Sequence, residues 1–146
     1  MIVTVVIASI AILALVMVFQ ESLKNMDRQR GLQTANLLAD DLMNEIRSKK
    51  YLDPLTPTAG QTNRVKFDSV DDYNTLRGGG PPRTIEGEVM DEFSDLTWRV
   101  IVTNVSAANF NFVTNSSDFK RITVIVSNTA FIVSNMSVVS RYDGAD

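Results

Sequence analysis

The chain has 146 residues and a net charge of −3 at neutral pH, which allows one modest domain beyond any long N-terminal segment. It contains no cysteine and no histidine, and this excludes disulfide bonds, thiolate metal sites, cysteine nucleophiles and histidine-based catalytic triads. No basic patch with interleaved aromatic residues is present, so nucleic acid is not an expected partner. We therefore expect a structural or binding protein and not an enzyme. A carboxylate-dependent hydrolase would need a cleft around an acid of raised pKa, which a sequence does not reveal.

The first segment, 1–19 (MIVTVVIASIAILALVMVF), is almost entirely apolar, and the first charged residue is Glu21. As a helix it would be about 28 Å long, close to the thickness of the hydrocarbon core of a bilayer. It lacks the basic start and the small-residue cleavage site of a secretory signal peptide, so we expect a retained transmembrane helix. Small residues let helices approach closely, although a hydroxyl in such a segment can also bond back to its own helix. The candidates for close helix packing are Thr4, Ala8, Ser9, Ala11 and Ala14.

The next segment, 20–52, predicts an amphipathic continuation of the same helix. No proline interrupts it, and Pro54 disfavours helical geometry just beyond it, so one helix is predicted from about residue 1 to about residue 50. Polar and charged residues occupy most other positions, and the apolar residues recur at steps of three and four. These apolar residues are Leu23, Met26, Ala35, Leu38, Leu42 and Ile46.

Residues 53–146 predict a head domain built on a small antiparallel sheet. Weak strand signals occur at 64–68 and 83–90, and the Gly-Gly-Gly-Pro-Pro sequence at 78–82 predicts a turn. Residues 109–118 predict a long loop or a ragged hairpin. The strongest β patterns lie in 98–103, 122–127 and 131–140.

Three or four antiparallel strands after one long helix predict an α+β fold, with the second half of the helix packed on the sheet. The apolar residues that alternate along the strands have an evident partner in the apolar stripe of the helix. The expected core between helix and sheet consists of Leu38, Leu42, Ile46, Trp98, Val100, Val102, Ile122, Val124 and Val126.

This order of parts resembles the type IV pilins and the pseudopilins of type II secretion, and the minor pilins of mannose-sensitive haemagglutinin pili most of all. The resemblance implies the pilin fold and a minor pilin-like structural subunit of a type IV pilus, with 1–19 forming the filament core. One alternative is a pseudopilin of a type II secretion system. Another, of a different class, is a single-pass membrane-anchored periplasmic binding or sensor module. Four stretches carry the resemblance: 1–11 (MIVTVVIASIA), 35–54 (ANLLADDLMNEIRSKKYLDP), 67–74 (FDSVDDYN) and 120–142.

The resemblance also implies partners and a location. The partners are other pilin or pseudopilin subunits, prepilin peptidase and the assembly machinery. The location is the inner membrane with a periplasmic head domain, and then a periplasmic or extracellular filament. Family members carry a basic leader ending in glycine and, a few positions later, a glutamate; we expect these features to precede Met1. Taken alone, the positive-inside rule would place Lys24, Arg28 and Arg30 in the cytoplasm, and a basic leader would reverse that orientation.

The acidic group Asp68, Asp71 and Asp72 is a weak candidate for calcium, because hard cations are bound by several carboxylates close together. The spacing is not that of an EF-hand loop, and aspartate is also an ordinary turn residue. We therefore expect no cofactor, with calcium as the alternative.

Overall fold

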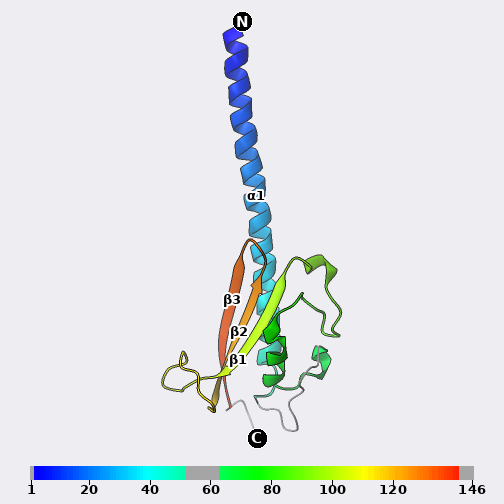
Figure 1. The fold of residues 1–146 in the computed structure, drawn as a ribbon, viewed down its shortest axis with the longest axis vertical. Coiled ribbons are helices and arrows are strands. Elements are labelled where there is room, and N and C mark those ends of the chain that lie inside the picture. The colour runs from blue at the N-terminus through cyan, green and yellow to red at the C-terminus, as the bar shows by residue number, and fades with distance from the viewer. Residues whose placement is uncertain (1, 52–62, 142–146) are drawn as a thin grey trace. The chain divides into compact units, whose positions relative to one another are not determined.

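The computed structural model describes residues 2–51 and 63–141, with side chains described from residue 12 onward. The chain forms two compact units, residues 1–34 and residues 35–146. The helix α1, Ile2–Arg47, supplies all of the described part of the first unit and enters the second unit at Ala35 (Figure 1).

The helix α1 ends at Arg47, three residues before the predicted end near residue 50. The amide of Ser48 donates to the carbonyls of Asn44 and Glu45, at 3.1 and 3.2 Å, and so tightens the last turn. The chain then leaves in an extended direction, because Lys50 pairs with the segment around Ser69 as an isolated bridge. The helix therefore ends three residues before this bridge.

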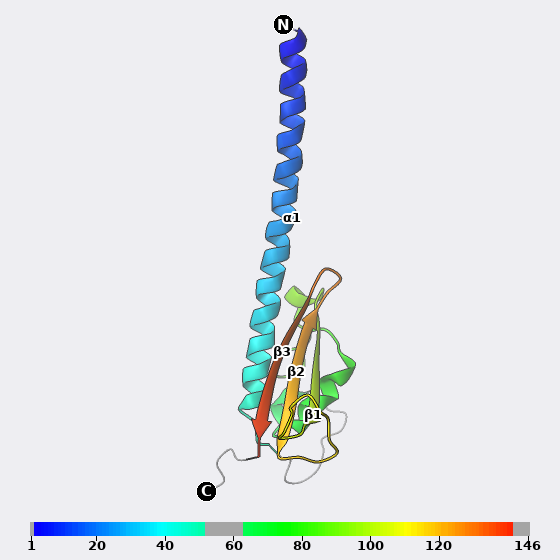
Figure 2. The same cartoon turned by 90° about the vertical axis from the view of Figure 1, so that its left-hand side faces the viewer.

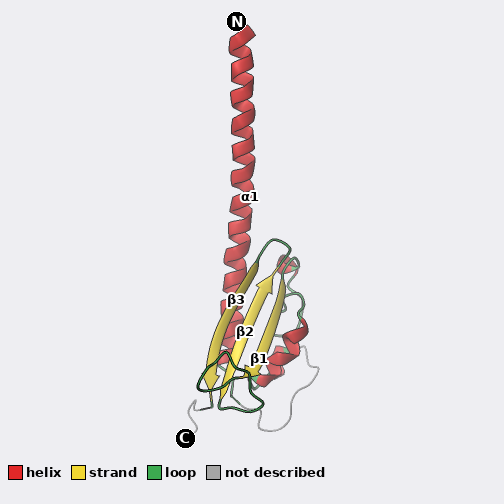
Figure 3. Cartoon of the chain, turned by 60° about the vertical axis from the view of Figure 1, so that its left-hand side comes forward, coloured by secondary structure: helices red, strands yellow, loops and turns green. Residues whose placement is uncertain are grey.

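Three antiparallel strands form the sheet of the second unit: β1 (Thr97–Asn104), β2 (Phe119–Ser127) and β3 (Ile132–Ser140), in the order β1-β2-β3 (Figure 3). Val124 lies at the centre, opposite Val100 on β1 and Asn135 on β3. A long loop joins β1 to β2, as predicted, and contains one bridge between Val105 and Val113. The predicted α+β class is therefore confirmed, with three strands in the described part of the chain.

The core of the second unit lies between one face of the sheet and the part of α1 that begins at Ala35. Ala35 and Ala39 are fully buried, and their small side chains let the helix backbone come close to the sheet. Leu38 is only half-buried, because Ala39 and Met43 occupy the inward positions of these turns. The other expected core residues are all buried: Leu42, Ile46, Trp98, Val100, Val102, Ile122, Val124 and Val126.

Two stretches predicted as weak strands are not strands. Residues 64–68 contain the short 3-10 helix η1 (Arg64–Lys66), which forms because the side chain of Asn63 accepts a hydrogen bond from Val65 N–H. Residues 83–90 form a tight turn with a single bridge between Arg83 and Val89. Local side-chain and turn hydrogen bonds therefore outcompete a short extended pattern in both places.

The glycine-rich segment closes a longer 3-10 helix, η2 (Asp71–Gly78). Gly79 has φ +74° and ψ 163°, a conformation that L side chains rarely adopt. Gly80 then pairs with Trp98 along the outer side of β1. The predicted turn thus brings the chain back against the edge of the sheet.

Candidate functional site

The first unit presents an unbroken apolar surface, formed by exposed large side chains between residues 12 and 19. Eight successive residues point in all directions around a helix, so the apolar character is not confined to one stripe. A helix that is apolar all round requires an apolar environment on every side. We call this set of side chains the N-terminal apolar surface; its members, 46–69% exposed, are Ile12, Leu13, Leu15, Val16, Met17, Val18 and Phe19.

The small residues expected to pack between helices lie at the start of the same helix. Ala14 is exposed. The side chains of Thr4, Ala8, Ser9 and Ala11 are outside the described residues. In the part of the chain whose side chains are described, no helix has an apolar stretch long enough to cross a membrane.

The three calcium candidates do not point to a common centre. The buried Asp72 Oδ2 accepts hydrogen bonds from the amides of Asp68 and Ser69 and from Ser69 Oγ, at 3.0–3.1 Å. Asp71 forms an ion pair with Lys120, and Asp68 is exposed. Among the described residues no group of three or more carboxylates has the geometry to hold a metal ion. Asp72 instead fixes the turn that starts η2, and Asp71 neutralises a buried lysine.

That lysine, Lys120, is 4% exposed and lies on the inner face of β2. Its Nζ donates to Asp71 Oδ2 at 2.6 Å and to the carbonyl of Tyr51 at 2.7 Å, and it lies 4.2 Å from the centre of the Tyr51 ring. The Tyr51 hydroxyl donates to the carbonyl of Ser117. Burying an ammonium group is costly unless it is paired, and here a carboxylate, a carbonyl and a π-face pair it. The cluster ties the segment after α1 to the start of β2.

A polar cavity of about 250 Å³ lies beside this cluster and is open to solvent. Partial burial raises the pKa of the Tyr51 phenol, the carboxylates of Asp118 and Asp71 raise it further, and Arg141 lowers it. The phenol therefore stays neutral at physiological pH and acts as a hydrogen-bond donor. With Lys120 already paired, the cavity wall offers mainly amide and hydroxyl groups, from Asn104, Asn115, Ser116 and Ser117.

A second polar cluster lies where α1, η1, η2 and β1 meet. Arg64 is 3.5 Å from the carboxylate of Glu45, and its guanidinium lies 4.7 Å from the centre of the Trp98 ring. The Tyr73 hydroxyl donates to Glu45 Oε1 at 2.7 Å, and the Tyr73 ring packs edge-on against Phe67 at 4.9 Å. Glu45 thus connects the last turns of α1 to two other elements. The cluster is a structural cross-link in the interior of the second unit.

Burial raises the pKa of Tyr73 far above its ordinary value of 10.0, and the hydrogen bond and negative charge of Glu45 add to the effect. In the unfolded chain the phenol ionises near pH 10, whereas in the folded chain it keeps its proton. The contribution of Tyr73 to the stability of the folded state is therefore fully present below about pH 10, and it is lost as the pH rises above that value. We expect Tyr73→Phe to flatten this alkaline decline, as measured by urea unfolding at neutral pH and above pH 10. An unchanged slope in the Tyr73→Phe variant would show that the phenol of Tyr73 does not titrate in this way.

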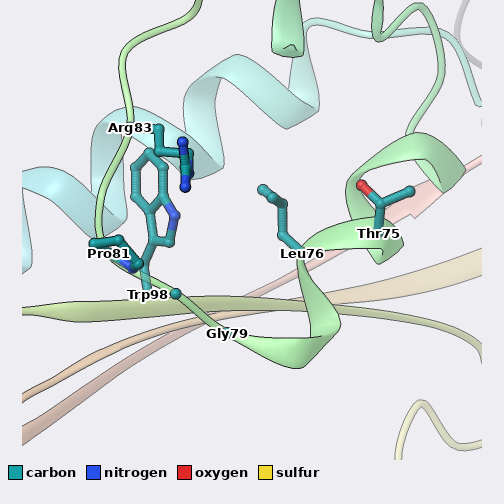
Figure 4. Close-up of a pocket in the computed structure, with 7 residues that line it drawn as sticks. Thr75, Leu76, Gly79, Pro81, Arg83 and Trp98 are labelled. Carbon is teal, nitrogen blue, oxygen red and sulfur yellow. The ribbon is translucent and has the colours of Figure 1, made fainter. Parts of the chain in front are cut away.

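A second cavity, of about 240 Å³, lies next to the buried Trp98. Figure 4 shows Trp98 and Leu76 on either side of it, with Arg83 beside the indole ring. The guanidinium of Arg83 donates to the carbonyl of Gly87 at 2.7 Å, which holds it in place. Arg83 is the only charged residue among those that line this cavity. The described lining therefore provides one fixed positive charge and contains no acid–base pair.

Neither of the two buried cations, Lys120 and Arg64, was predicted from the sequence. Lys120 is in phase with Ile122, Val124 and Val126 along β2, so the alternation of that strand already placed it on the buried face. Arg64 had no such signal, because its burial depends on Glu45 and Trp98, which come from distant parts of the chain.

Comparisons of the chain with models of protein families, with characterised proteins and with solved structures found no match.

Proposed function

We propose that the protein is a minor pilin-like structural subunit of a type IV pilus, assembled through its N-terminal helix and carrying the pilin fold. The observation that supports this proposal best is the N-terminal apolar surface, whose seven large side chains have no partner within the described chain. Fully burying one such side chain is worth about 1.5–3 kcal/mol, so this surface needs an apolar environment. A lipid bilayer supplies one before assembly, and a bundle of like helices supplies one afterwards.

Transfer between these two environments requires little net change in hydrophobic free energy. Lipid tails are as apolar as the side chains that line a helix bundle, so packing and helix contacts decide the balance. Both environments leave the backbone hydrogen bonds of a helix intact. A helix that is apolar all round therefore suits a subunit that leaves the membrane and enters a filament core.

The second unit supports the same proposal through its architecture. The part of α1 that begins at Ala35 forms one wall of the core, and the three-stranded sheet forms the other. The Glu45–Arg64 pair and the Lys120–Asp71 pair fasten the segments between α1 and β2 to this core. Such a head domain presents a surface for lateral contacts outside a filament core.

Two alternatives predict the same helix and head domain. A pseudopilin of type II secretion would polymerise in the periplasm, and a single-pass binding or sensor module would remain a monomer in the inner membrane. Among the described residues, Asp71 is paired with Lys120 and Asp72 accepts hydrogen bonds from neighbouring amides, and no group of three or more carboxylates could hold a metal ion. The exposed apolar helix suits all three hypotheses, so they are separated by processing and by recovery in filaments.

Processing by prepilin peptidase tests the proposal. The protein is produced from its own coding region with a C-terminal tag, in cells with and without prepilin peptidase, and the mass of its N-terminal peptide is measured. We expect a shortened chain only where the peptidase is present. A chain of one unchanged mass in both strains, recovered only from the membrane, would contradict the proposal and favour the anchored module.

A further inference from the structure

The cavity beside Trp98 lies where the chain returns to the outer edge of β1. Trp98 N–H donates to the carbonyl of Gly80 at 2.8 Å, and Gly80 N–H donates back to the carbonyl of Trp98 at 3.1 Å. Figure 2 shows the green segment that precedes β1 beside this strand, on the side away from β3. Residues of this segment, between Thr75 and Arg83, line the cavity together with Trp98. The two backbone hydrogen bonds therefore fix Trp98 relative to the rest of the lining.

The indole N–H of Trp98 is a hydrogen-bond donor that has no acceptor among the described residues. Trp98 is 4% exposed, and a buried indole N–H usually has a partner. In the described chain, the buried side-chain atoms that lack both a partner and access to solvent are Arg64 Nε and Thr103 Oγ1, so the indole nitrogen is not sealed in the core. Figure 4 shows this nitrogen on the side of the ring that faces Leu76, across the cavity. The cavity wall therefore holds a fixed donor for a ligand.

Arg83 supplies further donors beside the indole ring. A guanidinium carries five N–H groups and no acceptor. Arg83 Nη1 donates to the carbonyl of Gly87 at 2.7 Å, and this is the only acceptor of Arg83 within the described residues. The ion pairs of the described chain belong to Arg64, Lys120 and Arg141, so no described carboxylate neutralises Arg83. The bond to Gly87 therefore holds the guanidinium in place and leaves its charge for a ligand.

We propose that this cavity binds a small monocarboxylate with a short apolar tail. A guanidinium matches the two oxygens of a carboxylate in a planar, bidentate pair, and the indole N–H adds a third donor for the same anion. Leu76 and Pro81 provide uncharged wall that suits a hydrocarbon tail. The volume of about 240 Å³ is below the roughly 300–1,000 Å³ of pockets for drug-sized ligands, which favours a small acid.

The lining also separates this class of ligand from other anions. Inorganic phosphate is polar on every side, so it would meet the donors and leave the apolar wall without a contact. Donors that are already held in place reduce the ordering cost of binding. The site belongs to the second unit and uses no residue of the N-terminal apolar surface. It is therefore independent of the assembly proposed above, and failure of one proposal leaves the other unaffected.

The fluorescence of Trp98 reports binding directly, because it is the only tryptophan of the chain and it lines the cavity. The full-length chain in a non-ionic detergent is titrated at constant ionic strength with acetate, butanoate, pentanoate, pentanamide and inorganic phosphate. We expect a saturable change with pentanoate, and an affinity that rises up to about fourfold with each added methylene group. Pentanamide lacks the charge and phosphate lacks the tail, so each is expected to bind about tenfold more weakly than pentanoate or worse.

Arg83→Gln removes the charge from the cavity, and Arg77→Gln is its matched control. Arg77 is exposed on η2 and does not line the cavity. We expect Arg83→Gln to weaken pentanoate binding about tenfold or more, and Arg77→Gln to change it by about twofold at most. Arg83→Lys keeps the charge without the planar fork, so its affinity is expected to lie between those of Arg83→Gln and the unsubstituted chain. Urea unfolding of each variant checks that the second unit is intact.

A titration of the unsubstituted chain with pentanoate that shows no saturable change would overturn the proposal, whatever the variants do. Equal affinities for acetate, pentanoate and phosphate would also overturn it, as would equal losses in Arg83→Gln and Arg77→Gln. A free aliphatic acid and the C-terminus of a polypeptide that ends in an apolar residue carry the same chemistry. The peptide acetyl-Gly-Gly-Leu distinguishes them: binding tighter than that of pentanoate and lost in the peptide amide assigns the site to a polypeptide terminus, and weaker binding assigns it to a free acid.

Discussion

Replacing Leu15 with aspartate is expected to remove the protein from filaments. Leu15 is 69% exposed in the middle of the N-terminal apolar surface, so its substitution leaves the core of the second unit unchanged. An aspartate at the centre of a membrane helix costs about 3 kcal/mol, which corresponds to roughly a hundredfold in an equilibrium constant. The charge is equally unfavourable in a dry bundle of helices. The measurement is the amount of the variant in the sheared filament fraction as a share of all the variant produced, compared with the same share for the unsubstituted chain.

Leu37→Asp is the matched control for this experiment. Leu37 lies on the same helix and is 66% exposed, but it is beyond the apolar run and next to polar positions. We expect its incorporation into filaments to remain within about threefold of the unsubstituted chain, because an exposed surface substitution is nearly neutral. Equal losses from Leu15→Asp and Leu37→Asp would contradict the assignment of assembly to the N-terminal apolar surface.

Replacing Leu42 with alanine is expected to give the largest loss of stability of a single truncation in α1. Leu42 is 1% exposed and packs in the centre of the helix–sheet core. Truncating a buried leucine costs about 2–5 kcal/mol, because it loses apolar contacts and leaves a cavity. Urea unfolding of the full-length chain in detergent measures this change, and the single, buried Trp98 provides its fluorescence signal.

Leu38→Ala supplies the comparison on the same helix. Leu38 is only half-buried, so its truncation removes fewer contacts and leaves a space that solvent can fill. We expect a loss of about 1 kcal/mol or less, close to the usual effect of a partly exposed substitution. A loss for Leu38→Ala as large as that for Leu42→Ala would mean that the helix faces the sheet with a different side.

The helix α1 and the strands β1 and β2 could be predicted from the sequence because their patterns are long and regular. The alternation around Val100 and Val124 and the absence of proline along α1 each extend over eight residues or more. The short segments could not be predicted, because a run such as 64–68 carries too little pattern to outweigh one side-chain hydrogen bond from Asn63. The choice between Leu38 and Ala39 as the inward residue depends on how closely the helix approaches the sheet, which is a tertiary property.

The candidate sites depended even more on contacts between distant residues. From the sequence, the acidic cluster at 68–72 suggests a bound metal cation. The cation that Asp71 contacts is instead the side chain of Lys120, on a strand almost fifty positions later. Asp72 is engaged by neighbouring amides, which no spacing rule reveals.

Recovery of the protein in sheared filaments is the most direct test of its proposed role as a pilus subunit. Filaments are sheared from cells that produce the tagged protein from its own coding region, collected by sedimentation, and probed for the tag alongside the membrane fraction. The proposal predicts the processed chain in the filament fraction, with its loss from that fraction in Leu15→Asp. Recovery of the chain solely as an unprocessed membrane monomer would contradict it.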